Sequence, residues 1–269
     1  MSIRCDNSIA VRWYGLNALE FRHRNGSFMI DPYVSRSPEK ITIPEEVEKY
    51  LVSRPDFVLM THSHWDHLPD MPLLIRRTGT VLYASRTACN IMRSLGVAEK
   101  NLHELSYGER LELPGGVRVT ALESRHMGDP AGEIFYDGPQ NPQTFSRLEN
   151  WRCGEVFAFL IEIDGKKFLN IGSANLHEPT MHGMECDIFF CGISRWQAGF
   201  PELLRKNIRF QWLIPTHHDE YTRPLSDFHL RNDLERLKEA MPELPTRELP
   251  VLRWTELFPV PAEPPSKQG

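Results

Sequence analysis

The stretch "MTHSHWDHLPD", which runs from Met60 to Asp70, concentrates three histidines and one aspartate within six residues. The apolar run "DFVLM", which ends at Met60, is typical of a buried strand. Neutral imidazole and carboxylate groups are common protein ligands for metal ions. We therefore interpret the stretch as a metal-binding loop at the end of a strand, against the alternative of a solvated polar loop. The four candidate ligands are His62, His64, Asp66 and His67.

The spacing of these residues separates them into two pairs. His62 and His64 are two positions apart, so in extended backbone both side chains point to the same side and can reach one ion. Asp66 and His67 follow after the chain has begun to turn, and can address a second ion beside the first. Two ligands per ion are too few to close a site. We therefore expect further histidines at the ends of other apolar strands.

Two such histidines occur later in the chain, each after a strand-like run. His126 follows "VRVTALESR", and His217 lies just after "WLIP", with His218 as its competing neighbour. Each metal site would keep a position for water, as a catalytic zinc site must. The expected ligand sets are His62, His64 and His126 for the first metal, and Asp66, His67 and His217 for the second.

The rest of the chain alternates strand-like runs with helical stretches and shows no internal repeat. Turn signals at Asn25-Gly26 and Asp164-Gly165 indicate hairpins. Residues 125–152 show no sustained period, and a loop of this length is typical of a functional flap or an insert. Strands without strict βαβ alternation predict an α+β (α/β) fold in which two packed sheets are covered by helices. Helices are expected at 44–52, 68–79, 86–96, 201–210 and 226–241.

The length and composition allow one large domain with a substantial core, or two small ones. The chain has 269 residues, of which 41% are hydrophobic and 25% charged, enough to bury a substantial core. We predict a single domain over residues 1–258 and a loose, proline-rich tail over 259–269. The net charge of -5 provides no basic field that would attract nucleic acid or an anionic membrane. The apolar runs are far shorter than the roughly 20 residues of a spanning helix, so no membrane insertion is expected.

The N-terminus and the cysteines favour a cytoplasmic location. The first residues lack the continuous apolar stretch of a secretory signal. The five cysteines are scattered and form no CxxC pair, as expected of reduced thiols rather than of a disulfide framework. We therefore expect a cytoplasmic protein, and its assembly into a homo-oligomer is left open. The cysteines are Cys5, Cys89, Cys153, Cys186 and Cys191.

The HxHxDH pattern of residues 62–67 resembles the motif of the metallo-β-lactamase superfamily, and the resemblance extends over about residues 10–255. The run "VRWYGLNALEFRHRNGSFMIDPY" looks like the opening hairpin of that family and contains Asp31, which matches the aspartate that supports the metal-bound loop. The style is closest to the branch that contains L-ascorbate-6-phosphate lactonase. The resemblance implies a four-layer αββα sandwich with its metal site at one edge, and it implies that His126 and His217 are the later ligands.

The chain departs from the family in the turn "NIGSAN", where Ser173 takes the place of the aspartate that usually bridges both metals. One subclass of metallo-β-lactamases also has a serine there and retains two zinc ions, so the change need not abolish the site. Without this carboxylate the pair of ions keeps one more positive charge. We expect the second metal to bind more weakly and the site to favour anionic substrates.

The resemblance implies a metal-dependent hydrolase that uses a metal-bound hydroxide to cleave an ester, lactone, amide or phosphoester bond. Asp66 would be the catalytic residue that orients the attacking water, and the substrate would be a small, anionic molecule. We expect two Zn²⁺ ions per chain, with Mn²⁺ or Fe²⁺ as alternatives. The competing functions are a mononuclear iron or di-iron oxidoreductase of the same fold and a degenerate metal-binding protein.

Three residues are weaker candidates for second-layer or substrate contacts. His177 and His182 occur in "NLHEPTMHG", where a rim position or a bond to backbone is the alternative. Arg195 follows the strand-like "FFCGIS", and a surface salt bridge would explain it equally well. Trp65, within the motif, is expected to form a wall of the pocket. Ser173 has no accompanying His and Asp arrangement, so we expect no role as a nucleophile.

Overall fold

The computed structural model describes residues 8–128 and 135–258, so the expected tail at 259–269 lies outside this part of the chain. The strands are β1 (Ala10–Trp13), β2 (Leu19–His23), β3 (Gly26–Ile30), β4 (Phe57–Leu59), β5 (Val81–Ala84), β6 (Leu102–Glu104), β7 (Arg110–Leu113), β8 (Val117–Glu123), β9 (Phe157–Ile163), β10 (Lys166–Ile171), β11 (Met184–Gly192), β12 (Ile208–Thr216) and β13 (Trp254–Glu256). The α-helices are α1 (Pro44–Tyr50), α2 (Met71–Thr78), α3 (Arg86–Ser94), α4 (Glu178–Met181), α5 (Phe200–Asn207) and α6 (Asp233–Ala240).

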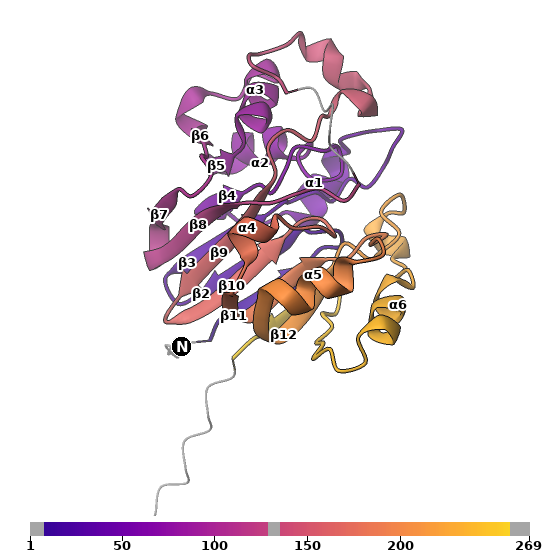
Figure 1. Ribbon diagram of the computed structural model, residues 1–269. Helices are drawn as coiled ribbons and strands as arrows, with labels where there is room; N and C mark the ends of the chain where they lie inside the picture. The colour runs from indigo at the N-terminus through magenta and orange to yellow at the C-terminus, as the bar shows by residue number, and fades with distance from the viewer. Residues whose placement is uncertain (1–7, 129–134, 259–269) are drawn as a thin grey trace, which may run out of the picture.

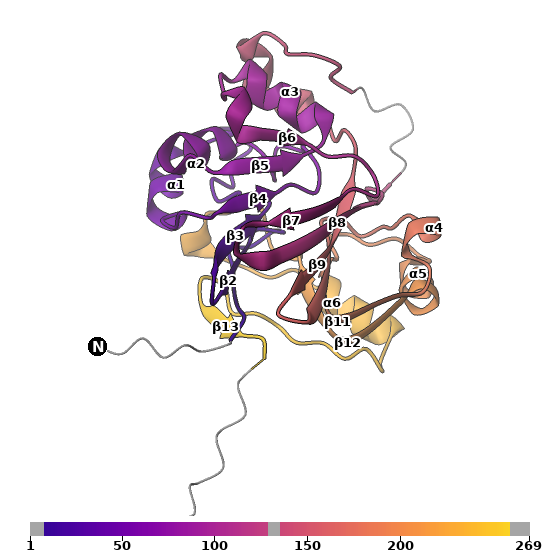
Figure 2. The ribbon, with the colours of Figure 1, turned by 90° about the vertical axis from the view of Figure 1, so that its left-hand side faces the viewer.

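Two sheets packed face to face form the centre of the molecule (Figure 1). One sheet has seven strands in the order β13-β1-β2-β3-β4-β5-β6, and the other has six in the order β12-β11-β10-β9-β8-β7. Helices α1 to α3 lie beside the first sheet, whereas α4 to α6 lie beside the second (Figure 2). These four layers confirm the αββα sandwich implied by the sequence.

Alternating apolar side chains place one core between the sheets and another under each layer of helices. Phe157 and Phe159 of β9 point into the central core, while Ala158 between them lies in the core beneath α5 and α6. The aromatic ring of Phe21 in β2 meets that of Phe190 in β11, with centroids 5.2 Å apart, and so joins the two sheets. Because both faces of β9 are buried, nearly every residue in it is apolar.

Parallel pairing brings the carboxyl ends of strands from both sheets to one edge. In the first sheet β3 pairs in parallel with β4, and in the second β10, β11 and β12 are parallel. Strand β8 runs antiparallel to β9, which runs antiparallel to β10, so β8 has the same direction as β10. The segments that follow β3, β4, β8, β10 and β12 carry, in this order, Asp31, His62, His126, Ser173 and His217.

The expected helix at 226–241 is wrong in its first half. Helix α6 begins only at Asp233, because the preceding residues pair with the segment that follows β12. The backbone N–H of Arg231 donates to the carbonyl of His218 at 2.8 Å, and Asp219 forms an antiparallel bridge with Leu230. These bonds hold residues 229–231 extended, so the helical pattern of the sequence is overridden by tertiary pairing.

Two other expectations need smaller corrections. The helix at 201–210 ends at Asn207, because Ile208 already pairs with Met184 as the first residue of β12. The loop at 125–152 contains two 3₁₀ turns, Pro142–Ser146 and Leu148–Asn150, within its described part.

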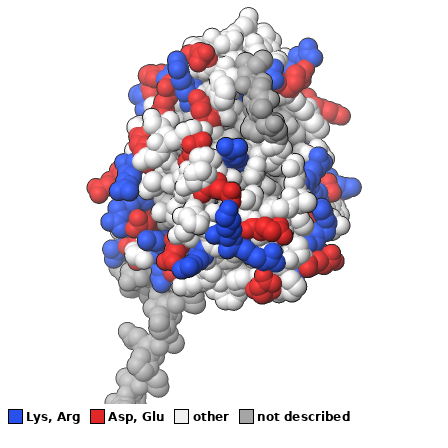
Figure 3. Space-filling model, viewed as in Figure 1, with Lys and Arg blue, Asp and Glu red and all other residues white. Residues whose placement is uncertain are grey.

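Two surface properties bear on the expected partners. No helix in the described residues has the length and apolar character needed to cross a bilayer. Basic and acidic side chains are interspersed over the face seen in Figure 3. The expectation that the chain binds no nucleic acid stays a prediction.

Candidate metal centre

A buried carboxylate after β3 organises the loop that carries the histidine motif. Asp31 is 1% exposed and accepts hydrogen bonds from Thr61, from its backbone N–H at 2.7 Å and from its hydroxyl at 2.5 Å. Its carboxylate also lies 2.8 Å from Nδ1 of His67. A proton on this Nδ1 leaves Nε2 of His67 as the lone-pair donor. These are the contacts that a support for the metal-binding loop requires.

Buried amides connect this carboxylate to the second sheet. Nδ2 of Asn17 donates to Asp31 at 2.8 Å, and the side chains of Asn17 and Asn170 exchange bonds at 3.1 and 3.2 Å. The hydroxyl of Thr216 donates to Oδ1 of Asn17 at 2.9 Å. Asn170 and Thr216 belong to β10 and β12, so the network ties the end of β3 to two strands of the facing sheet.

The predicted second ligand set is brought together. Asp66, His67 and His217 each place one potential ligand atom within 4.8 Å of the others. Nε2 of His217 is 3.2 Å from Oδ2 of Asp66. The competing His218 instead stacks on Trp13, with ring centroids 5.3 Å apart. The geometry therefore favours His217 over His218.

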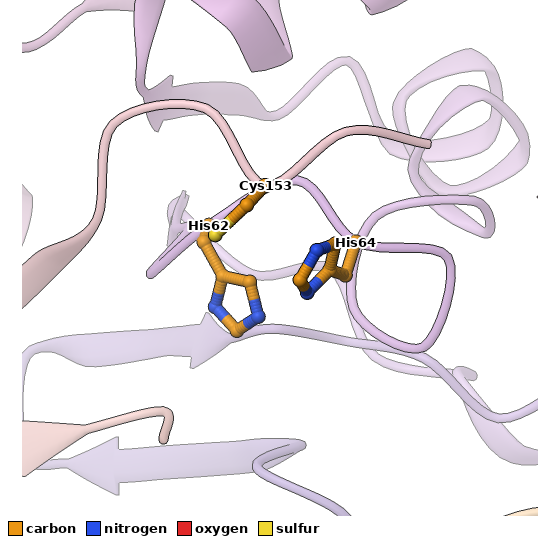
Figure 4. A group of neighbouring side chains, drawn as sticks. All are labelled: His62, His64 and Cys153. Carbon is orange, nitrogen blue, oxygen red and sulfur yellow. The ribbon is translucent and has the colours of Figure 1, made fainter. Parts of the chain in front are cut away.

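Two residues of the predicted first set, His62 and His64, lie together, and His126 packs beside them. His62 and His64 form a group with Cys153 in which the potential ligand atoms lie within 4.8 Å of one another (Figure 4). The ring centroid of His126 is 5.0 Å from that of His62 and 4.6 Å from that of His64. Nδ1 of His126 lies 2.8 Å from the carbonyl of Met127, and donation to it leaves Nε2 as a lone-pair donor. A thiol thus joins His62 and His64, with His126 packed beside the two imidazoles.

Nitrogens in both groups have the surroundings that a cation requires. Nε2 of His62, Nε2 of His67 and Nδ1 of His217 are buried and have no hydrogen-bond partner among the described residues. A buried polar atom in this state is costly unless a ligand satisfies it. Imidazole, thiol and carboxylate donors together are typical ligands of zinc and related transition metals. The residues therefore fit such ions.

Burial keeps the first group of histidines neutral. Burial, together with the neighbouring histidines, lowers the pKa of His62 well below its ordinary value of 6.5 and that of His64 to about 3. Burial also lowers the pKa of His126. Neutral imidazole is the form that binds metal, so these side chains need not lose a proton at neutral pH.

The second group is governed by attraction between opposite charges. Burial alone would raise the pKa of Asp66, but His67 and His217 hold it well below its usual range. Burial would lower the pKa of His67, but the carboxylates of Asp31 and Asp66 outweigh it and raise the pKa. Asp66 is therefore an ionised carboxylate at neutral pH, the state in which it can bind a cation.

We expect the metal-stripped protein to lose stability as the pH falls below 6.5. Its unfolded state binds a proton on His64 below that pH, whereas the folded state does so only near 3. The loss is about 1.4 kcal/mol per pH unit for each such histidine. Urea unfolding at several pH values between 7.5 and 5.5 measures it, and His64→Gln should flatten the slope. An unchanged slope in that variant would contradict the assignment.

A cavity of about 530 Å³ opens over the two groups. His64, Asp66, His126 and His217 line it, so donors from both groups face the same space. Its aromatic walls are Trp65, Trp151 and Tyr221, and its charged rim is formed by Glu149, Arg152 and Arg195. A small polar molecule could therefore contact both groups at once.

Ser173 and Arg195 both line this cavity. The Ser173 hydroxyl accepts a hydrogen bond from the backbone N–H of Met127 at 2.8 Å, and thereby holds the segment that carries His126. Arg195 has a φ of +48°, and its backbone N–H donates to Asp233 at 3.1 Å. Its guanidinium is 5.9 Å from the ring centroid of Tyr221.

His177 and His182 do not line the cavity. Nδ1 of His177 is 2.8 Å from the hydroxyl of Thr180, within the turn that begins α4. Nδ1 of His182 is 3.3 Å from Oδ1 of Asn207 at the end of α5. Both therefore have local structural contacts, and the structure does not bring them to the predicted site.

Cys153 and Arg152 were missed by the sequence interpretation. Arg152 ends the aperiodic segment at 125–152 and Cys153 directly follows it, where no strand pattern indicates which side chains point inward. The one available signal was that a loop of this length is often functional. Their proximity to His64 depends on tertiary folding and carries no short-range pattern.

A fully buried ion pair fixes the segment that follows His217. Nη1 of Arg36 is 2.6 Å from Oδ2 of Asp219, and both side chains are 0% exposed. The same guanidinium donates to the carbonyls of Arg223 at 2.6 Å and Glu220 at 2.8 Å. Oδ1 of Asp219 accepts a bond from the backbone N–H of Leu16 at 2.8 Å. The loop after β3 and the loop after β12 are thereby joined.

Gly172→Ala is expected to destabilise the fold by about 1–3 kcal/mol through overpacking. A Cβ at Gly172 would lie 2.2 Å from Oγ1 of Thr61 and 3.2 Å from Oδ2 of Asp31, so it would displace the support of the metal-binding loop. Gly138→Ala is the matched control, because no atom lies within 4 Å of its added Cβ. Urea unfolding compares the two, and equal midpoints would refute the crowding argument.

The fold and the paired ligand groups define a known class of protein. Residues 27–225 match the family described as the β-lactamase superfamily domain. The chain therefore belongs to the metallo-β-lactamase superfamily. It is 31% identical over 128 residues to a UPF0173 metal-dependent hydrolase of Methanopyrus kandleri, across 48% of this chain and 50% of that protein. The chain spans about half the length of the curated relatives it matches.

Solved structures share the fold at lower identity. Igni18, a metallo hydrolase from Ignicoccus hospitalis, is similar with a TM-score of 0.58 and 17% identity, over 92% of this chain and 97% of that chain. CmlA, a diiron β-hydroxylase from Streptomyces venezuelae, is similar with a TM-score of 0.55 and 15% identity, over 94% of this chain and 55% of that chain. At such identities the similarity shows the fold alone.

Proposed function

We propose that the protein is a metal-dependent hydrolase that cleaves an ester, lactone or phosphoester bond in a small, anionic molecule. The observation that carries the proposal is the meeting of both ligand groups in one cavity. The hydrolase name of the related protein from Methanopyrus kandleri supports the same class. We propose Zn²⁺ as the metal, because the donors are imidazoles, a carboxylate and a thiol.

A bound zinc-type ion would supply a Lewis acid and lower the pKa of a bound water to about 7. Around it, Asp31 holds the orientation of His67 through Nδ1. Asp66, ionised and next to His217, can accept a hydrogen bond from an approaching water and orient it toward the substrate. The side chains of Trp65 and Trp151 form aromatic walls of the cavity.

The charged rim supports the choice of an anionic substrate. Arg152 and Arg195 line the cavity, together with the acidic Glu149. Nε of Arg152 is buried and has no hydrogen-bond partner in the described residues. A guanidinium binds carboxylate or phosphate groups through paired hydrogen bonds. Phosphorylated lactones, as in the lactonase branch, and phosphodiesters both meet this requirement.

Metal analysis combined with a substrate panel tests the function. The protein is purified without added metal, its metal content is measured, and it is assayed with phosphodiesters, phosphorylated lactones and β-lactams. We expect hydrolysis that a chelator abolishes and Zn²⁺ restores. Hydrolysis that survives complete metal removal would overturn the proposal. Stoichiometric iron with oxygen consumption would instead favour the oxidoreductase alternative.

Arg195→Ala is expected to raise KM for an anionic substrate about tenfold or more, because a charge-assisted hydrogen bond contributes about 1.5–3 kcal/mol. The effect on kcat should be smaller, since the residue would contact a group away from the reacting bond. Arg125→Ala is the matched control, because Arg125 is exposed and does not line the cavity. Steady-state kinetics with an anionic and an uncharged ester distinguish charge recognition by Arg195 from a general effect of the substitution. An equal effect on both esters would exclude charge recognition.

A further inference from the structure

Cys153 lies against the two histidines that open the metal-binding motif. Its side chain is 0% exposed, and Figure 4 shows it extending from its loop toward His62. The potential ligand atoms of the three residues lie within 4.8 Å of one another. Two donors of one tetrahedral zinc ion are about 3.3–3.6 Å apart, as follows from zinc–nitrogen and zinc–sulfur bond lengths. A contraction of these separations to that range would place all three donors on one ion.

Backbone hydrogen bonds hold this cysteine in place. Ser63, which lies between the two histidines in sequence, donates from its backbone N–H to the carbonyl of Cys153 at 3.0 Å. Its hydroxyl donates to the carbonyl of Arg152 at 2.7 Å. Ser63, which separates His62 from His64, therefore anchors the backbone of residues 152–153 to the histidine motif. The thiol and the imidazoles form one connected unit.

The next residue permits the required path of the chain. Gly154 has a φ of +66°, and a Cβ there would lie 2.5 Å from Cβ of Thr87. Any other residue would meet both strain and a steric clash. The backbone thus turns sharply after Cys153 against helix α3, which fixes the direction of the preceding side chain.

A second observation points independently to a cation at this place. Nε2 of His62 has no hydrogen-bond partner among the described residues, and the side chain is 1% exposed. The other ring nitrogen, Nδ1, is already 3.1 Å from Oγ1 of Thr61. The remaining nitrogen, Nε2, is therefore available to a cation held at this cluster.

We propose that Cys153 is a ligand of the first metal ion, together with His62, His64 and His126. The inference rests on the proposed metal centre and concerns its donor set. On binding, the sulfur–metal bond forms and the thiol proton leaves to solvent. The thiolate supplies a negative charge to a centre that has Ser173 in place of the usual carboxylate. The negative charge of the thiolate would therefore offset the extra positive charge expected from the absence of the bridging aspartate.

The donor set has two chemical consequences. A thiolate favours zinc and other soft transition metals over Mg²⁺ and Mn²⁺. Four protein donors also complete a tetrahedron, so the first ion has no open position for water. The open position then belongs to the group of Asp66, His67 and His217. Loss of Cys153 should weaken metal binding at the first site.

Cobalt substitution tests the ligand directly, without any assay of hydrolysis. Co²⁺ is added to metal-stripped protein, and the near-ultraviolet absorption is recorded. We expect a thiolate-to-cobalt charge-transfer band in the wild type that Cys153→Ser removes. Cys89→Ser is the matched control and should retain the band, because Cys89 is a buried residue of helix α3 outside both ligand groups, and its sulfur is 3.8 Å from the carbonyl of His103. A band that persists in Cys153→Ser would overturn the proposal.

A measurement on the wild type alone covers the case in which the variant does not fold. X-ray absorption at the zinc edge should show one sulfur neighbour at about 2.3 Å for the first ion. A shell of nitrogen and oxygen only, in protein with both ions bound, would refute Cys153 as a ligand. That result would leave the proposed hydrolase intact, since the three histidines suffice for a catalytic site. Absence of any bound metal would instead refute the function itself.

Discussion

His64→Ala is expected to lower kcat/KM for the hydrolysed substrate by about a thousandfold or more. Loss of this imidazole removes a donor from the first ligand group and one wall of the cavity. A thousandfold loss corresponds to about 4 kcal/mol of transition-state stabilisation, within the range that metal-ion catalysis supplies. Kinetics and metal content are measured on the same preparation, and both should fall.

His103→Ala is the matched control for this experiment. The side chain of His103 is 39% exposed and lies 2.8 Å from Glu109, away from both ligand groups. We expect its kinetics and metal content to equal those of the wild type. Full activity in His64→Ala would show that hydrolysis takes place elsewhere and would remove the basis of the proposed function.

Arg36→Met should destabilise the protein by about 3–5 kcal/mol, because it leaves a buried carboxylate without its partner. In the wild type, Arg36 pairs with Asp219 and donates hydrogen bonds to the carbonyls of Glu220 and Arg223. In the variant, the charge of Asp219 and these carbonyls would be left without that partner. Urea unfolding measures the loss. We also expect weaker metal binding at His217, since the pair holds the segment that follows it.

Two further variants identify the cause of this loss. Arg209→Met removes the same side chain from a pair with Glu185 in which the two side chains are 83% and 66% exposed, and should cost less than about 1 kcal/mol. Adding Asp219→Leu to Arg36→Met should recover part of the stability, because no unpaired charge then remains. If the double variant is as unstable as the single one, the cost comes from packing.

Short-range patterns in the sequence were enough to predict the two packed sheets and four of the polar side chains that line the cavity, which are His64, Asp66, His126 and His217. Period-two runs such as β9 identify strands, and the HxHxDH motif places its own four residues within one loop. His126 and His217 could be expected because parallel strands bring their carboxyl ends to one edge. Residues 229–231 could not, because their extended form depends on hydrogen bonds to residues 218–220.

Cys153 and the pair of Arg36 and Asp219 share a different limitation. Each contact joins segments that are far apart in the sequence and lies in an irregular loop. No periodicity constrains the direction of a side chain there, so only the folded backbone decides it. Arg195 was expected at the cavity because it follows a strand, whereas Arg152, which follows none, was not.

The buried exchange of bonds between Asn17 and Asn170 has a mechanical consequence for the whole sandwich. Asn17 bonds at once to Asp31 beneath the motif and to Thr216 beside His217. Any sliding of one sheet over the other must break these amide bonds in a dry interior, where water cannot replace them. The segment that carries His67 and the segment that carries His217 are thus mechanically coupled through Asn17. A displacement of one sheet would therefore change the positions of ligands in both segments.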